Sequence, residues 1–470
     1  MYRWYICGIL AAFIGLTGCR TSQSAGRVRP QARPLGKQLS TSHAPVGPEN
    51  GAAARDREAP APSGELTLRK AMAATLLRNP GLQAFSRDLR AAEARIVEAG
   101  LWDNPEVEVE FDEFGGTGDF AGTNALETAV SLGQTFPLGG DIERRRELAG
   151  YRAELAGWDY EAARVAALTE LTQRYVAVLA ARRRLNVARE ALQIARDVKE
   201  TTRKRIEAGA APRIELVRAS VTVATSKVDF RRAERLHQSA RRQLSLMWNQ
   251  SDPGFDKVAG DLEKVHTPPE PGVLVSLINQ NPEVARWAAK ISARQAEASL
   301  ARAESIPDVT GRIGVKRLGE IDETAFVAGL SLPLPVFDRN QGKVRASRLK
   351  EVAARRRRRE TEVRLERRLS AAYSRLANSY DEVVAIRQEA LPPAREAFDL
   401  TENAFQKGDL GFLDVLDAER TLVELRTRYV EALVTYHEAA AEIEGLIAQS
   451  LRNVSDVTES QPSTKRESQE

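Results

Sequence analysis

Cysteine, histidine, methionine and aromatic residues are scarce in this chain. Its 470 residues include two cysteines, four histidines, three methionines and 6% aromatic residues. A disulfide framework or a zinc site needs more cysteine and histidine at short spacings. No phosphate-binding glycine loop and no nucleophile elbow occurs either. The sequence therefore offers no catalytic constellation, no cofactor and no metal site, and few of the rings that fill compact globular cores.

An excess of charge of one sign is also lacking. The 69 basic residues almost balance the 65 acidic ones, which leaves a formal net charge of +4. A run of five arginines from Arg355 to Arg359 would cover the whole circumference of a helix, so it cannot face one ligand. Acidic Glu351, Glu360 and Glu362 lie beside it. We interpret the run as a solvated helix surface and expect no nucleic-acid partner.

The N-terminus resembles a bacterial lipoprotein signal. Arg3 precedes a short apolar run over residues 4–16, which predicts a signal peptide over residues 1–18. The segment LTGC resembles a lipobox, in which Cys19 would be acylated and become the first residue. Cys7 lies within the signal, so Cys19 would be the only cysteine of the exported chain. The alternative is a plain signal peptide that happens to contain a cysteine.

Two stretches have no apolar period. Residues 19–63 are rich in Pro, Ala, Gly, Ser and Arg, and they predict a lipidated, flexible tether. Residues 453–470 are polar and predict a disordered tail. The folded part is therefore expected between these stretches.

The folded part contains an internal repeat. Asn79-Pro80 and Asn281-Pro282, about 200 positions apart, each open an Ala-, Arg- and Glu-rich helical segment. Each copy then has a proline before a strand, a long helix, a glycine turn and a further helix. The matching residues are Pro105 with Pro307 and Gly209 with Gly408. Chance similarity between Ala-rich helices is the alternative, but it does not explain ordered landmarks in register. We predict repeats over residues 64–262 and 263–452.

Each repeat is predicted to contain two strands, within about residues 105–137 and 307–335. Polar and apolar residues alternate along them, as in the segment EVEVEF that starts at Glu106. This alternation predicts one wet and one apolar face. A half-buried soluble sheet would give the same pattern. Four strands are too few to close a barrel, so a membrane-inserted chain would have to pool strands from several copies.

The predicted helices are too long for a compact domain. They indicate hairpins over about residues 140–249 and 341–450, and an unbroken helix from 140 to 207 would span roughly 100 Å. Apolar residues at seven-residue intervals indicate coiled-coil packing. These are Leu171, Val178, Leu185 and Leu192 in the first hairpin, and Leu422, Tyr429, Tyr436 and Ile443 in the second. Pro392-Pro393 is expected to kink the second long helix.

From about Leu66 to Leu451 the chain resembles the TolC superfamily of outer-membrane factors. The segments TFPLGGDIERR and LPLPVFDRNQGK are similar to that family's junctions between strand and helix. The resemblance implies a mainly α fold with a β-barrel part. Each chain would give four strands to a shared twelve-stranded barrel, and its helices would form a periplasmic tunnel. The resemblance also implies a homotrimer in the lipid of the bacterial outer membrane, with a periplasmic adaptor and an inner-membrane pump of the resistance-nodulation-division type as partners.

Within the superfamily, NPEVEVEFDEFGG and ETAVSLGQTFPLGGDIERR resemble the CzcC-like branch, which serves pumps that export divalent cations such as cobalt, zinc and cadmium. The chain departs from that branch in its TFPL segment, where Pro-Leu-Glu-Leu is more usual. The resemblance thus implies a passive exit duct for heavy-metal cations and not an enzyme. A duct for drugs or polypeptides would have the same architecture. A lipid-anchored adaptor or coiled-coil scaffold is less well supported, because adaptors typically carry one helical hairpin.

Asp414 and Asp417 are the candidate gate residues. They lie three positions apart, just after the turn at Gly408, so their carboxylates share one helix face. The resemblance places these positions in the family's periplasmic constriction, where three copies would form a ring of like charges that attracts cations. The alternative is a solvated acidic pair on a helix surface.

The two glycine turns are candidate contacts for an adaptor. Glycine ends a helix where the chain must reverse. The resemblance implies that the family meets its adaptor at these tips, through Gly209, Arg213, Glu215, Gly408, Phe412 and Leu413. Ordinary turn chemistry would account for the same residues without any partner.

Overall fold

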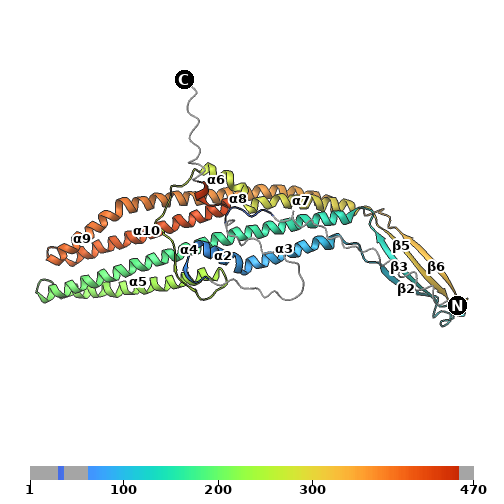
Figure 1. Cartoon of the computed structure of the whole chain (residues 1–470), viewed down its shortest axis with the longest axis horizontal. Helices are drawn as coiled ribbons and strands as arrows, with labels where there is room; N and C mark the ends of the chain where they lie inside the picture. Colours follow the sequence, from blue (N-terminus) through green and yellow to red (C-terminus); the bar gives the residue numbers. More distant parts are fainter. Residues whose placement is uncertain (1–29, 36–61, 455–470) are drawn as a thin grey trace, which may run out of the picture.

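The molecule is elongated, with long helices at one end and a sheet at the other (Figure 1). The computed structural model describes residues 30–35 and 62–454. The predicted signal peptide, Cys19 and residues 455–470 lie outside the described residues. No helix in the described ranges combines the length and the apolar character needed to cross a membrane.

Two helical hairpins make up most of the length. α4 (Asp141–Glu207) has 67 residues, about 100 Å at the ordinary helical rise, and it packs against α5 (Arg213–Leu246). The second hairpin consists of α8 (Gln341–Ala385), the π-helical η4 (Ile386–Ala390), α9 (Leu391–Lys407) and α10 (Phe412–Ile447). Both sets of helices lie where the sequence predicts hairpins.

The seven-residue apolar pattern does mark the packed faces. Leu171, Val178 and Leu192 of α4 are buried, while Leu185 is half-buried. All four members of the second pattern, on α10, are buried. The side chains at seven-residue intervals therefore form the seam between neighbouring helices, as the pattern predicts.

The second long helix is interrupted just before its prolines. Pro392 and Pro393 stand in the first turn of α9, and the wide turn η4 precedes them directly. A proline cannot donate a backbone hydrogen bond, and its ring crowds the carbonyl four residues earlier, which here falls within η4. The distortion that we expected at the prolines thus lies about one turn before them.

Four strands form one antiparallel sheet of order β2-β3-β5-β6. They are β2 (Glu106–Asp112), β3 (Glu127–Phe136), β5 (Val309–Leu318) and β6 (Glu323–Ser331), with the short helix η2 (Gly118–Phe120) between the first two. β3 pairs with β5, so the sheet joins the two repeats and leaves β2 and β6 as its edges. The predicted strand region continued to residue 335. β6 ends at Ser331, because Pro333 lacks the N–H that a longer ladder would need.

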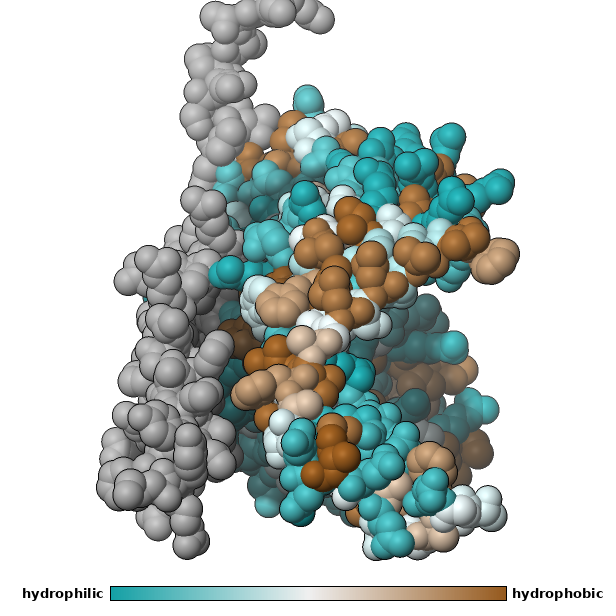
Figure 2. Space-filling model, turned by 90° about the vertical axis from the view of Figure 1, so that its right-hand side faces the viewer, coloured by the Kyte–Doolittle hydropathy of each residue, from teal (hydrophilic) through white to brown (hydrophobic). Residues whose placement is uncertain are grey.

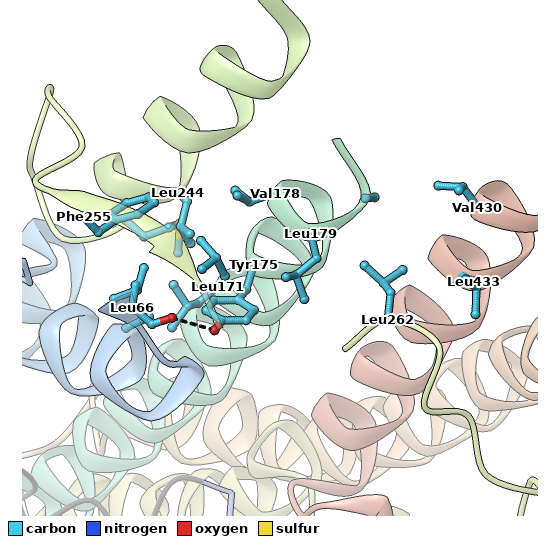
Figure 3. Close-up of a cluster of buried hydrophobic side chains, with 14 of the residues drawn as sticks. Leu66, Leu171, Tyr175, Val178, Leu179, Leu244, Phe255, Leu262, Val430 and Leu433 are labelled. Carbon is cyan, nitrogen blue, oxygen red and sulfur yellow. Dashed lines mark hydrogen bonds between the residues drawn. The ribbon is translucent and has the colours of Figure 1, made fainter. Parts of the chain in front are cut away.

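Between hairpins and sheet, shorter elements pack against the long helices. They are β1 (Gly64–Leu66), α2 (Leu68–Arg78), α3 (Pro80–Ala99), β4 (Phe255–Val258), α6 (Pro271–Leu277), η3 (Ile278–Gln280) and α7 (Pro282–Ala303). β1 and β4 pair in parallel, beside a buried core on α4 (Figure 3). There the Tyr175 hydroxyl donates to the Leu66 carbonyl at 2.9 Å. Burial raises the pKa of Tyr175 to about 12, so the hydroxyl keeps its proton.

The two Asn-Pro landmarks have the same structural role. The side chain of Asn79 accepts from the Leu82 N–H at 3.1 Å and caps α3, while its amide donates to the Met247 carbonyl at 2.9 Å. Asn281 caps α7 through the Glu283 N–H at 2.8 Å and donates to the Leu446 carbonyl at 3.0 Å. Each asparagine therefore joins the start of one helix to the end of the last helix in its own repeat.

The prediction of a flexible tether over residues 19–63 needs correction at residues 30–35, which lie against α4. Arg164 donates to the carbonyls of Leu35 at 2.8 Å and Arg33 at 3.1 Å, and the Arg33 N–H donates to Glu161 at 2.6 Å. Leu35 is buried beside Val165. The composition of the stretch predicted no contacts, but a buried ion pair on α4 provides hydrogen-bond partners for its backbone.

Candidate functional site: the helical tips and the two faces of the sheet

The first helical tip is closed by backbone hydrogen bonds around Gly209. The Gly209 N–H donates to the Ile206 carbonyl at 3.0 Å, and the Ala210 N–H donates to the Arg205 carbonyl at 2.7 Å. Gly209 has a φ of 71°, a conformation that suits glycine and ends a helix in this pattern. Arg213 and Glu215 follow in the first turn of α5, where the helix dipole favours a carboxylate.

The second tip repeats this geometry at Gly408, whose φ is 93°. The Asp409 N–H donates to the Ala404 carbonyl at 2.9 Å. Asp414 then accepts a hydrogen bond from the Gly411 N–H at 2.9 Å and so caps the start of α10. Asp414 thus has a local structural role whether or not it also serves as a gate.

Both candidate gate residues are exposed in a single chain. Asp414 and Asp417 lie in the first turns of α10, and their side chains are in contact with solvent. The cap on Gly411 uses one oxygen of Asp414, so its other oxygen remains available. The ring of carboxylates that we expect would arise only on assembly.

The candidate adaptor contacts divide into exposed and buried residues. Gly209, Arg213, Gly408 and Leu413 are exposed, and Glu215 is half-buried. Phe412 is 2% exposed, because its ring packs into a cluster with Phe405 and other apolar residues of the tip. We therefore correct the prediction for Phe412: its side chain belongs to the tip core, whereas Leu413, 59% exposed, and Leu410, 37% exposed, are available to a partner.

Arg205 connects the two tips within one chain. Its guanidinium donates to the carbonyls of Phe405 at 3.1 Å and Leu410 at 3.0 Å. It also lies over the Phe405 ring, 4.5 Å from the centroid. The end of α4 is thus joined to the turn between α9 and α10 by charge-assisted hydrogen bonds and a cation–π contact. Sequence reasoning did not single out this residue.

The sheet has one apolar face. Residues opposite one another in register share a face. One cross-strand row consists of Val107, Leu132, Ile313 and Ala328, and the next of Val109, Val130, Val315 and Phe326. Exposure along these rows reaches 93% at Phe326. Figure 2, which views the molecule from the sheet end, shows a band of hydrophobic residues with hydrophilic residues on either side.

The opposite face of the sheet is charged. Glu106, Glu108 and Glu110 alternate with the apolar residues of β2 and so lie on this face. Arg312 forms an ion pair with Glu108 at 2.5 Å, across Gly133, which has no side chain to intervene. Lys316 of β5 forms an ion pair with Glu127 of the adjacent strand β3. A face with these charges suits water, and the apolar face suits lipid.

Two of the described histidines, His437 and His237, have pKa values lowered by burial. The Nε2 of His437 lies 2.8 Å from the Leu262 carbonyl. Within residues 30–35 and 62–454, no group of three or more His, Cys, Asp or Glu side chains is arranged to hold a metal ion.

A sheet with one lipid-compatible and one charged face, continuous with helices of about 100 Å, defines a subunit of an outer-membrane channel. The family described as outer membrane efflux protein matches residues 72–250 and 273–449, one segment in each predicted repeat. The chain belongs to this family. It is thus an outer-membrane protein that extends into the periplasm, with the expected TolC-like fold.

Relatives and solved structures agree with this assignment. The cobalt-zinc-cadmium resistance protein CzcC of Cupriavidus metallidurans is 29% identical over 385 residues, covering 82% of this chain and 90% of the relative. The pyoverdine export outer membrane protein OpmQ of Pseudomonas aeruginosa is 26% identical, covering 77% and 82%. A crystal structure of CusC matches with a TM-score of 0.70 at 15% identity, covering 82% of this chain and 92% of that one.

Proposed function

We propose that three copies of this chain form a passive exit duct with a shared twelve-stranded barrel and a periplasmic tunnel. The supporting observation is the four-stranded sheet with an apolar face and two open edges, β2 and β6. Each unpaired backbone group would cost several kcal/mol in lipid, and pairing β2 of one copy with β6 of the next removes this cost. Native mass spectrometry of detergent-extracted protein should give the mass of a trimer. A stable, membrane-inserted monomer would refute the proposal.

The substrates that we propose are divalent heavy-metal cations, delivered by an inner-membrane pump of the resistance-nodulation-division type through a periplasmic adaptor. Support comes from the likeness to the relative named for cobalt, zinc and cadmium resistance. The alternative is a larger organic substrate, because another relative is named for pyoverdine export. The chain should restore growth on zinc, cobalt and cadmium to Cupriavidus metallidurans lacking CzcC. Restored siderophore export without metal resistance would favour the alternative.

At the tips, we propose that Asp414 and Asp417 from three copies form the gate and make it cation-selective. Three copies bring up to six carboxylates around one axis, and such a ring attracts cations. Replacing both residues by Asn keeps the shape and removes the charge. The reversal potential of single channels in a salt gradient should then shift toward zero. The control is Asp409→Asn, an exposed carboxylate in the turn that precedes α10. If all variants are as cation-selective as the unmodified channel, Asp414 and Asp417 are solvated surface residues and do not form the gate.

The exposed tip residues are the proposed contacts for the adaptor. Leu413 is an apolar side chain exposed at the second tip, and Arg213 is exposed at the first. Leu413→Asp should weaken binding of the adaptor to the purified duct, because it places a charge where an apolar side chain would be desolvated. Leu349→Asp, an exposed leucine of α8 that is 62% exposed and far along the chain from either tip, is the control.

A further inference from the structure

A cavity lies between the first hairpin and α10, and its wall begins at Leu416, the residue before Asp417. Its volume is about 560 Å³, and residues of α4, α5 and α10 form its walls. Cavities of roughly 300–1,000 Å³ are typical of small-molecule sites in proteins. Apolar side chains, among them Val187, Leu416 and Val423, line part of it.

Glu419 lines this cavity and is the one buried carboxyl among its walls. It is 6% exposed, and no described residue donates a hydrogen bond to it or forms an ion pair with it. A carboxylate in this state is costly unless a partner satisfies it. Burial raises the pKa of Glu419 to about 7, so a large fraction of the carboxyl groups is ionised near neutral pH.

The threonines of the cavity add acceptors rather than donors. Thr427 donates its hydroxyl hydrogen to the carbonyl of Val423 in its own helix at 2.8 Å. Thr222 and Thr225 of α5 do the same with carbonyls of that helix. A hydroxyl that donates to the backbone still offers lone pairs, so these threonines remain acceptors.

The remaining charged groups lie at the exposed rim and balance one another. They are Arg184 of α4, Asp229 of α5, and Arg420 and Glu424 of α10. Exposed charges of both signs contribute little net field inside the cavity. A divalent metal ion would need several carboxylates, and only Glu419 is buried here. The acceptors instead suit a group with several N–H donors on an apolar stem.

We propose that this cavity binds a small organic ammonium ion, whose charged group pairs with Glu419 and whose apolar part contacts the side chains of Val187, Leu416 and Val423. The site is distinct from the gate at Asp414 and Asp417, and it does not depend on the identity of the exported substrate. The ammonium ion supplies the hydrogen bonds that the buried carboxylate lacks, and its stem displaces water from apolar walls.

The test is calorimetric titration of the full-length protein in detergent with benzylamine, which stays protonated at the pH values used, and with benzyl alcohol as its neutral counterpart. Benzylamine should bind with one site per chain. It should bind about tenfold more tightly at pH 8 than at pH 6, because ionised Glu419 falls from about nine-tenths to about one-tenth of the population as pH decreases through a pKa of about 7. Benzyl alcohol should show no such pH dependence.

Three variants complete the experiment. Glu419→Gln should weaken benzylamine binding at pH 8 at least tenfold and abolish the pH dependence. Glu424→Gln removes an exposed rim carboxylate and should change affinity less than twofold. Val423→Phe fills the cavity while keeping the carboxyl group, so it should abolish binding of both compounds in a protein of unchanged helical content. The proposal is overturned if benzylamine does not bind at millimolar concentration, or if it binds Glu419→Gln as tightly as the unmodified protein.

Discussion

Replacing Arg164 by Met should release residues 30–35 from α4. Glu161 and Arg164 are each 3% exposed, and Arg164 supplies two of the hydrogen bonds that hold the segment, to Leu35 and Arg33. Removing one partner of a buried ion pair costs about 3–5 kcal/mol, because the other charge stays buried without compensation. If most of this free energy is lost from the docked state of residues 30–35, the population in which the segment is released should rise about 100-fold or more, because 1.4 kcal/mol corresponds to a factor of ten.

The release can be measured by maleimide labelling of a Leu35→Cys variant, because position 35 is buried when the segment is docked. Peptide mapping by mass spectrometry separates this label from any label on Cys19. Arg152→Met is the matched control: this arginine of α4 pairs with Glu297 at 3.4 Å, but its side chain is 61% exposed. Labelling should increase in Arg164→Met and stay unchanged in Arg152→Met. Equal labelling rates in both would show that the ion pair does not hold the segment.

Three further predictions concern the cap, the sheet and the lipid anchor. Asn281→Ala removes the α7 cap and the bond to Leu446, so it should lower the unfolding free energy by about 1–3 kcal/mol, seen as a lower urea midpoint. Phe326→Arg places a charge on the apolar face, which costs about 2–4 kcal/mol in lipid, so the amount of membrane-inserted protein should fall. Val327→Arg, on the opposite face, should leave this amount unchanged. Mass spectrometry of the N-terminal peptide should show acyl chains on Cys19, and an unmodified N-terminus cut elsewhere would contradict this.

Much of the fold could be predicted from the sequence because its signals are periodic and local. Alternation in the EVEVEF segment predicts the two faces of the sheet, and seven-residue spacing predicts the seams on α4 and α10. The paired Asn-Pro landmarks reveal the repeat, and their caps explain why Asn precedes Pro in both copies: Asn79 and Asn281 each satisfy a helix start. Proline at the first helical position costs no hydrogen bond there.

The contacts between distant segments could not be predicted in the same way. Arg205 bonds backbone carbonyls of another hairpin, and any sequence at positions 405 and 410 offers a carbonyl. The docking of residues 30–35 likewise depends on backbone groups, so the composition of the stretch carries no sign of it. Glu419 did leave a signal: it lies on the same stripe as buried Val415 and Leu422, at spacings of four and three residues. An acidic residue in such a stripe indicates either an ion pair or a site.

The repeat also separates residues that shape the fold from residues that serve one copy alone. When the tip turns are aligned on Gly209 and Gly408, Glu215 corresponds to Asp414, so an acidic residue occupies the first turn of the returning helix in both copies. This is what the dipole of any helix start favours, and the cap on Gly411 fits that role. Asp417 and Glu419 instead correspond to Arg218 and Ser220. Helix formation does not require acids at these two positions, because the first copy forms its helix without them. Of the acidic residues at the second tip, Asp417 is therefore the stronger candidate for the gate, and Glu419 for a site of its own.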